Sequence, residues 1–180
     1  IVAIVGILST VNPFLIVTEF MSDGDMKSYL RRQRSALIRK FTSGDFLLAA
    51  TQICSAMSFL ESKTVVHRDL AARNVLVKDD FSCLKISDFG MARTLVESDY
   101  YRQESGGDIP IKWMAPESIR DRIFSHASDV WSFGILLYAI IFADLPWERP
   151  CMDDKEFAAF IKAEIDKWGP SIRKAGVYAD

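Results

Sequence analysis

The stretch that decides the fold is Val65–Val77, which reads VVHRDLAARNVLV. The apolar runs at its two ends have the composition of short buried β-strands. The eight residues between them, His67–Asn74, include five charged or hydrogen-bonding side chains. A polar loop between buried strands is a common way for a rigid scaffold to present reactive groups. Taken alone, the stretch fits a hairpin loop held by salt bridges equally well, so the surrounding chain has to decide.

The composition describes an ordinary globular domain. The chain has 180 residues, of which 49% are hydrophobic and 26% charged. This length predicts one domain, or one domain with part of a second, and the apolar fraction allows a sizeable core. The net charge of −2 excludes bulk electrostatic attraction to nucleic acid or to an anionic membrane surface. We therefore expect no nucleic-acid partner.

The cysteines and the longest apolar run indicate where the chain resides. Cys54, Cys83 and Cys151 are odd in number and far apart, which predicts a reducing compartment and hence a cytoplasmic location. The first two lie in apolar patterns and are predicted to be small core residues. Val130–Ala143 is too short to span a bilayer and is better explained as a buried core helix, so no membrane segment is expected.

The N-terminal region has a strand pattern followed by a helix pattern. Ile1–Ser9 and Phe14–Met21 are both rich in β-branched residues, and Asn12-Pro13 joins them, which predicts a β-hairpin. Ser22–Asp25 then has the composition of a turn and helix N-cap, with Met26–Arg34 as a short helix.

A long helix then leads to the polar loop. Thr42–Asp45 has the form of a capping box, and apolar residues at helical spacing continue to about Leu60. Beyond the loop, Val75–Val77 and Cys83–Ile86 are predicted strands joined by the turn Lys78–Ser82.

The motifs that follow identify a family resemblance. Asp88-Phe89-Gly90 comes directly after a predicted strand, Ala115-Pro116-Glu117 stands further on, and SDVWSFG occupies Ser128–Gly134. In this order after HRDLAARN, they resemble the protein-tyrosine kinase family, especially the receptor type such as the insulin-receptor, Trk and discoidin-receptor kinases. The resemblance covers roughly residues 1–150. It implies an α+β protein kinase-like fold, mainly the helical large lobe with a β-hairpin remnant of the small lobe.

Two stretches favour tyrosine over serine as the acceptor. Arg73 stands four residues after Asp69, whereas serine/threonine kinases place a lysine two residues after this aspartate. In tyrosine kinases the proline of the loop before A-P-E packs on the phenol ring of the acceptor. By resemblance, Pro110, Lys112 and Trp113 are then expected to bind a tyrosine-containing protein substrate.

The resemblance also assigns catalytic roles and implies ATP and Mg²⁺ as cofactors. Asp69 would orient the tyrosine hydroxyl and accept its proton, and Arg73 would place positive charge near the transferred phosphoryl group. Asn74 and Asp88 would hold magnesium, which prefers hard oxygen ligands.

Other positions would contact the adenine ring. The backbone of Glu19 and Met21 falls at the expected hinge, Thr18 at the gatekeeper position, and Leu76 under the base.

A further set of residues is expected to support the loop. Asp129 would accept hydrogen bonds from the backbone of His67 and Arg68. His67 would pack with Phe89 and Ile4. Glu117, the glutamate of A-P-E, lacks its usual arginine partner in this sequence and would be costly if buried alone.

Tyr100 and Tyr101 match the paired activation-loop tyrosines of several receptor kinases. A phosphate on Tyr101 would carry about −1.5 to −2 charges, and Arg68 and Arg93 could pair with it. The simpler alternative is two exposed tyrosines in a loop. The family pattern favours phosphorylation, and with it phosphotyrosine-binding adaptors as partners.

Some expected features do not occur in the sequence. No G-x-G-x-x-G is present, and Val2-Ala3-Ile4 is not the V-A-I-K strand, because Val5 follows it and it lies too close in sequence to the expected hinge for a helix to intervene. We therefore expect residues 1–21 to be a small-lobe hairpin and hinge, and residues 22–163 a large lobe. The tail, residues 164–180, does not follow the kinase pattern. Together with the preceding helix it is similar to the C-terminus of bacterial tricarboxylate-binding receptors, or is simply an amphipathic helix.

Three functions follow. The first is a catalytic tyrosine kinase domain, present in part and expected to be inactive alone because the glycine-rich loop and the strand lysine are absent. The second is a kinase-like module that is phosphorylated and docks partners without catalysis. The third is a solute-binding protein, suggested by the tail, against which the full catalytic loop and the lack of a visible signal peptide argue.

Overall fold

A computed structural model describes residues 1–10, 13–36, 41–95, 99–103 and 111–142. The helices in these ranges are α1 (Met26–Ala36), α2 (Ser43–Ser62), α3 (Pro116–Asp121) and α4 (His126–Phe142), with 3₁₀ turns η1 (Ala72–Asn74) and η2 (Ile111–Trp113). The strands are β1 (Ile4–Leu8), β2 (Leu15–Thr18), β3 (Gly24–Asp25), β4 (Val65–Val66), β5 (Val75–Lys78), β6 (Cys83–Ile86), β7 (Arg93–Thr94), β8 (Tyr101–Arg102) and β9 (Ile123–Phe124). The α+β class is confirmed.

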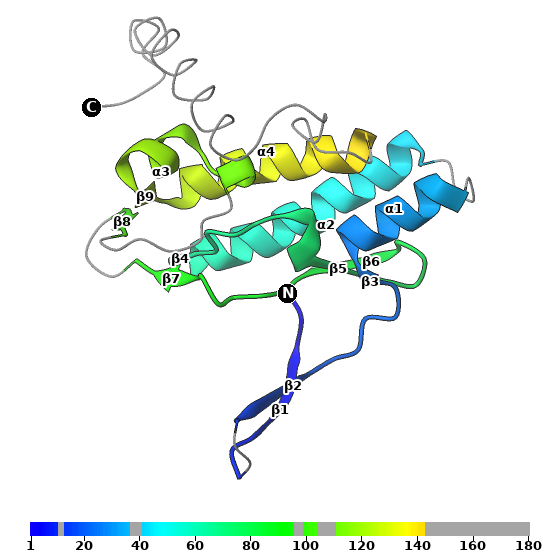
Figure 1. Cartoon of the computed structure of the whole chain (residues 1–180), viewed down its shortest axis with the longest axis horizontal. Coiled ribbons are helices and arrows are strands. Elements are labelled where there is room, and N and C mark those ends of the chain that lie inside the picture. The colour runs from blue at the N-terminus through cyan, green and yellow to red at the C-terminus, as the bar shows by residue number, and fades with distance from the viewer. Residues whose placement is uncertain (11–12, 37–40, 96–98, 104–110, 143–180) are drawn as a thin grey trace, which may run out of the picture.

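The predicted N-terminal hairpin is present and projects away from the helical body (Figure 1). β1 and β2 pair antiparallel from Ile4 opposite Thr18 to Leu8 opposite Leu15, with a bulge between Ile4 and Gly6. Its base is joined to the body by a backbone hydrogen bond of 2.9 Å from the Val2 N–H to the carbonyl of Ile86.

The helix starts follow the local sequence. The Asp25 carboxylate accepts a 2.8 Å hydrogen bond from the Ser28 N–H, which satisfies a free donor in the first turn of α1. At α2 the predicted capping box is confirmed: Thr42 and Asp45 each accept the other's backbone N–H through the side chain. Gly24 and Asp25 also pair with β5 as strand β3, which the turn pattern did not predict.

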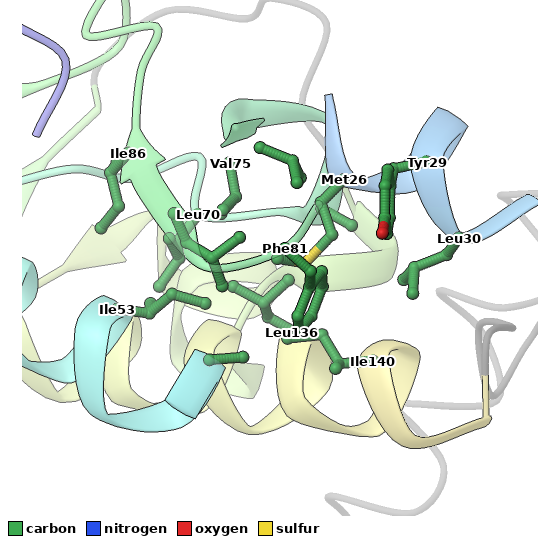
Figure 2. Packing of buried hydrophobic residues seen from close by; sticks show 14 residues of the cluster. Met26, Tyr29, Leu30, Ile53, Leu70, Val75, Phe81, Ile86, Leu136 and Ile140 are labelled. Atoms are coloured by element: carbon green, nitrogen blue, oxygen red, sulfur yellow. The ribbon is translucent and has the colours of Figure 1, made fainter. Parts of the chain in front are cut away.

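The core forms where α1, α2 and α4 meet the sheet β3-β5-β6. Phe81, in the turn between β5 and β6, is fully buried although the turn lies far from the helices in sequence. Its ring stacks on Tyr29 at 5.7 Å and meets Phe41 edge-on at 5.1 Å. Figure 2 shows Phe81 among Met26 and the α4 residues of this cluster.

α4 confirms the predicted helix but not its predicted burial. Leu136 and Ile140 are buried on one face, whereas Val130 on another is 68% exposed. Cys54 of α2 is also exposed, which corrects its predicted core position, and Cys83 is half-buried. When a helix is apolar on all sides, its sequence does not indicate which side packs against neighbouring elements. In α4 the described elements cover the side with Leu136 and Ile140 and leave Val130 exposed. No helix in the described ranges is long and apolar enough to cross a membrane.

Replacing Phe81 with alanine should lower the free energy of unfolding by about 3–5 kcal/mol, because it removes a buried ring and leaves a cavity. Urea denaturation of the 180-residue chain measures the change. Phe59→Ala, at an exposed position of α2, is the matched control and should cost under about 0.5 kcal/mol. Equal losses in the two variants would contradict the central position of Phe81.

Candidate active site

The polar loop lies between short strands, as predicted. β4 enters it and pairs with β7, Val65 opposite Thr94 and Val66 opposite Arg93, and β5 leaves it into the sheet with β6. Both ends of the loop are therefore held by strand pairing, which fixes where the loop begins and ends on the scaffold.

The Asp129 carboxylate in the first turn of α4 holds the loop backbone. One oxygen accepts the His67 N–H at 2.7 Å, and the other accepts the Arg68 N–H at 3.0 Å. Both expected hydrogen bonds are thus present, in a site where Asp129 is only 3% exposed. Burial raises the pKa of Asp129, while the two backbone hydrogen bonds and the nearby His67 and His126 act in the opposite direction.

Arg68 connects the loop to the segment after Asp88-Phe89-Gly90. Its backbone has a positive φ of 69°, which turns the chain sharply before Asp69. Its buried guanidinium donates to the carbonyl of Met91 at 3.1 Å and to the Gln103 side chain at 2.5 Å. Burial lowers the pKa of Arg68. The interactions are those of a structural arginine.

Asp69, Arg73 and Asn74 form one cluster. Arg73 donates to one carboxylate oxygen of Asp69 in an ion pair. The Asn74 amide donates at 2.7 Å to the other oxygen and also, at 2.7 Å, to the backbone carbonyl of Asp69. The turn η1 creates this geometry, since it brings residues four and five positions after the aspartate back toward it. The carboxylate is therefore held in one orientation and beside positive charge.

Trp113 contacts this cluster from η2. The Arg73 guanidinium lies 4.5 Å from the centre of the Trp113 ring, and the Ser132 hydroxyl of α4 donates at 2.7 Å to the Trp113 carbonyl. Lys112 lies half-buried on the same turn, while Pro110 lies outside the described residues. The expected substrate loop therefore meets the polar loop through its tryptophan.

His67 is buried and packs on Phe89, with ring centres 5.1 Å apart. Its Nε2 lies 3.2 Å from the carbonyl of Ser87. The third expected member of this stack, Ile4, is 63% exposed in the hairpin, so it does not share the buried position. A residue on a projecting hairpin cannot be assigned to a buried stack from sequence alone.

Asp88 and Asn74 are joined through the intervening Ser87, whose N–H and hydroxyl donate to the Asn74 carbonyl at 2.8 and 3.0 Å. Asp88 is exposed and has a positive φ of 60°. Among the described residues, no three His, Cys, Asp or Glu side chains group as a metal site. One carboxylate and one amide oxygen nevertheless suit Mg²⁺, which in phosphate sites takes few protein ligands.

The expected hinge carries an ion pair that the sequence analysis missed. Lys85 Nζ lies 2.6 and 2.7 Å from the two carboxylate oxygens of Glu19, and the Ala3 N–H donates to one of them at 2.8 Å. The hydrogen bond from Lys85 is the main cause of a lowered Glu19 pKa, and it raises the pKa of Lys85. The partners are 66 positions apart, so no local pattern indicates the pair. Near these residues, Met21 is buried and Leu76 half-buried.

Glu117 is half-buried in the first turn of α3, so the expected cost of a fully buried carboxylate does not apply. The N-terminal end of a helix also favours a negative charge.

The two tyrosines occupy different environments. Tyr100 is exposed, whereas Tyr101 is half-buried in β8, which pairs with β9. The Arg68 guanidinium lies between the rings of Tyr101 and Phe124, at 4.4 and 4.3 Å from their centres, and Arg93 lies 5.8 Å from the Tyr101 ring. Two cations therefore already surround Tyr101.

A model of the family described as protein tyrosine and serine/threonine kinase matches residues 1–176. Insulin receptor-related protein of Cavia porcellus is 44% identical over 154 residues, which cover 82% of this chain and 12% of the relative. Insulin receptor of Xenopus laevis is 42% identical over 154 residues, which cover 82% of this chain and 11% of the relative. Insulin-like growth factor 1 receptor of Xenopus laevis is 42% identical over 169 residues, which cover 89% of this chain and 12% of the relative. The chain thus spans only about an eighth of the length of these relatives.

Asp129→Asn should lower the free energy of unfolding by about 1–3 kcal/mol, because an amide presents only one acceptor to two buried N–H groups. The matched control is Asp121→Asn, a surface carboxylate paired with the adjacent Arg120. Urea denaturation of both variants and the original chain measures the difference.

The same comparison has a defined pH dependence. A raised pKa in the folded state means that the Asp129 carboxyl favours folding most below its unfolded pKa of about 4, and that this contribution falls as pH rises through the folded pKa. The stability gap between the original chain and Asp129→Asn should therefore narrow with rising pH. A stability gap that widens with rising pH would show that the two backbone hydrogen bonds lower the pKa of Asp129 by more than burial raises it.

Proposed function

Because this chain belongs to the protein tyrosine and serine/threonine kinase family, we propose that it carries the catalytic part of a protein-tyrosine kinase. Such an enzyme transfers the terminal phosphoryl group of ATP to tyrosine hydroxyls in proteins. The observation that supports this most directly is the Asp69 carboxylate, held by Arg73 and Asn74 next to the ring of Trp113. The family uses ATP and a divalent metal ion.

Asp69 is proposed to orient the acceptor hydroxyl and take its proton. Its carboxylate is restrained on both oxygens and partly open to solvent, with 12% of the side chain exposed. A carboxylate with a fixed orientation can accept a hydrogen bond from a hydroxyl without reorganising, which favours proton transfer.

Arg73 is proposed to stabilise charge on the transferred phosphoryl group. Its guanidinium lies between the Asp69 carboxylate and the face of Trp113, which together limit where the positive charge can be. Fixed positive charge near the reacting oxygens lowers the barrier because it needs no rearrangement during the reaction.

Asp88 and Asn74 would hold Mg²⁺, which when bound would supply positive charge to offset the negative charge of the ATP phosphates. The adenine would lie against the hinge. The Glu19 N–H already donates to the Ala3 carbonyl at 3.0 Å, so we assign the Glu19 carbonyl and the Met21 backbone to the base, with Leu76 beneath it.

The proposed substrates are tyrosine-containing proteins, bound by Pro110, Lys112 and Trp113. Trp113 supports this assignment because it contacts Arg73, which is itself bonded to Asp69. A substrate held along η2 would therefore reach Asp69.

A second candidate is a docking module that is phosphorylated but does not catalyse. One observation favours it: the Tyr100 side chain is exposed and therefore accessible to a modifying enzyme. In this case phosphotyrosine-binding adaptors would be the partners.

The activity test uses a chain in which these residues follow a glycine-rich loop and a strand with a phosphate-binding lysine. Asp69→Asn should lower kcat for a tyrosine peptide by about 10²–10⁴-fold, because the hydroxyl proton loses its acceptor. Asp121→Asn is the control and should retain full rate. The 180 residues alone should give no transfer in either form. Undiminished transfer by Asp69→Asn would reject the catalytic proposal, and transfer by the 180 residues that Asp69→Asn removes would show that they suffice.

Phosphorylation of Tyr101 should slow hydrogen exchange in β8 by about fivefold or more, since a phosphate near two arginines forms new charge-assisted hydrogen bonds. A chain phosphorylated by an added tyrosine kinase is compared with its unmodified form by mass spectrometry. Tyr100→Phe should keep the effect and Arg93→Ala should reduce it. An unchanged effect in Arg93→Ala would contradict pairing with that arginine.

A further inference from the structure

The buried guanidinium of Arg68 has only neutral hydrogen-bond partners among the described residues. The side chain is 5% exposed, and it donates to the Met91 carbonyl at 3.1 Å and to the Gln103 side-chain oxygen at 2.5 Å. Its Nε is buried and has no hydrogen-bond partner in the described ranges. A buried cation is normally paired with an anion, because burial removes the water that would stabilise its charge. This site therefore favours an additional negative charge.

The charged groups nearest to Arg68 do not supply that anion. Asp129 is close, but each of its carboxylate oxygens accepts a backbone N–H of the polar loop. Burial lowers the pKa of Arg68, negative charge on the Tyr101 oxygen raises it, Arg93 lowers it further, and Asp129 raises it. Negative charge at Tyr101 would therefore stabilise the charged form of Arg68.

Gln103 connects Arg68 to the strand pair that carries Tyr101. Its backbone N–H donates to the Arg122 carbonyl at 3.0 Å, which continues the ladder in which Tyr101 lies opposite Phe124. Figure 1 shows β8 and β9 at the same end of the body as β4, which leads into the polar loop. The Gln103 amide thus attaches β8 to the polar loop through the same guanidinium that lies against the Tyr101 ring.

We propose that Gln103 is a neutral substitute for a phosphate on Tyr101, and that it holds β8 against the polar loop through Arg68 before Tyr101 is modified. An amide oxygen accepts from a guanidinium as a phosphate oxygen does, but it has no net charge and forms a weaker hydrogen bond. Gln103 then gives the unmodified chain part of the order that phosphorylation would give. Asp69 follows Arg68 directly, so the same order reaches the proposed catalytic residue. That consequence rests on the proposed kinase function, whereas the contact itself does not.

The first experiment measures amide hydrogen exchange in β8 and β9 of the 180-residue chain by mass spectrometry. Gln103→Met keeps the length of the side chain but removes the acceptor. Exchange should become about tenfold faster, because a buried donor of Arg68 loses its partner. Gln103→Glu should slow exchange about threefold relative to the original chain, because the hydrogen bond becomes charge-assisted.

The matched control is Gln33→Met in α1. Gln33 is also a half-buried glutamine, but its side-chain oxygen accepts no hydrogen bond among the described residues. The same substitution there should change exchange in β8 by less than about twofold, because no shared partner links the two positions.

The second experiment tests whether Gln103 and the phosphate act on the same arginine. Tyr101 is phosphorylated by an added tyrosine kinase in chains that carry Tyr100→Phe, with and without Gln103→Met. The factor by which phosphorylation slows exchange in β8 should be about three times larger when Gln103 is replaced, because the phosphate then supplies the acceptor that Arg68 lacks.

Three results would overturn the proposal. Equal exchange in Gln103→Met and Gln33→Met would show that the contact does not hold β8. Faster exchange in Gln103→Glu than in the original chain would show that the site does not favour negative charge. An equal effect of phosphorylation with and without Gln103→Met would show that the two groups act independently. Circular dichroism verifies the fold of each variant, and the Gln103→Glu comparison decides the question if Gln103→Met does not fold. None of these measurements requires catalysis by this chain, so the outcome is separate from the rate test of Asp69→Asn.

Discussion

One buried carboxylate holds the polar loop against the helical body. Asp129 accepts the backbone N–H groups of His67 and Arg68, and it thereby attaches the polar loop to the first turn of α4. Two buried donors without an acceptor would cost about 1–3 kcal/mol each, so a residue that satisfies both is strongly favoured here. Burial makes the charged form expensive, as the raised pKa indicates. Burying the Asp129 carboxylate therefore costs free energy, but removing it would leave two buried N–H groups without an acceptor, which would cost more.

Arg68 extends this constraint to the segment that carries Tyr101. Its N–H is held by Asp129, its positive φ turns the loop toward Asp69, and its guanidinium reaches Met91, Gln103 and the ring of Tyr101. One residue thus belongs to the polar loop and touches both the segment after Asp88-Phe89-Gly90 and a proposed modification site. Tyr101 and the proposed catalytic cluster are therefore linked structurally through one residue, Arg68, which precedes Asp69 in the chain.

The hairpin and the helical body differ in how they are stabilised. The body has a closed core in which Phe81 joins the sheet turn to α1 and α4. The hairpin has no core of its own among the described residues, and it is linked to the body by the Val2–Ile86 hydrogen bond and the Glu19–Lys85 ion pair. The proposed catalytic residues Asp69, Arg73 and Asn74 all belong to the body, so their arrangement does not depend on what covers the hairpin.

The sequence alone determined the order and type of the main elements and the grouping of the site. The capping box at Thr42 and the strands around His67–Asn74 are short-range patterns, and such patterns depend on neighbours in the chain. The grouping of Asp69, Arg73 and Asn74 was an expectation from the family resemblance, and the turn η1 brings the three residues together. Tertiary structure decided which surfaces are covered and which distant charges meet. The exposure of Cys54, Val130 and Ile4, the burial of Phe81, and the pairing of Glu19 with Lys85 all depend on elements far apart in the chain. Hydrophobic periodicity shows that a helix or strand has an apolar face, but only tertiary packing places another element against that face.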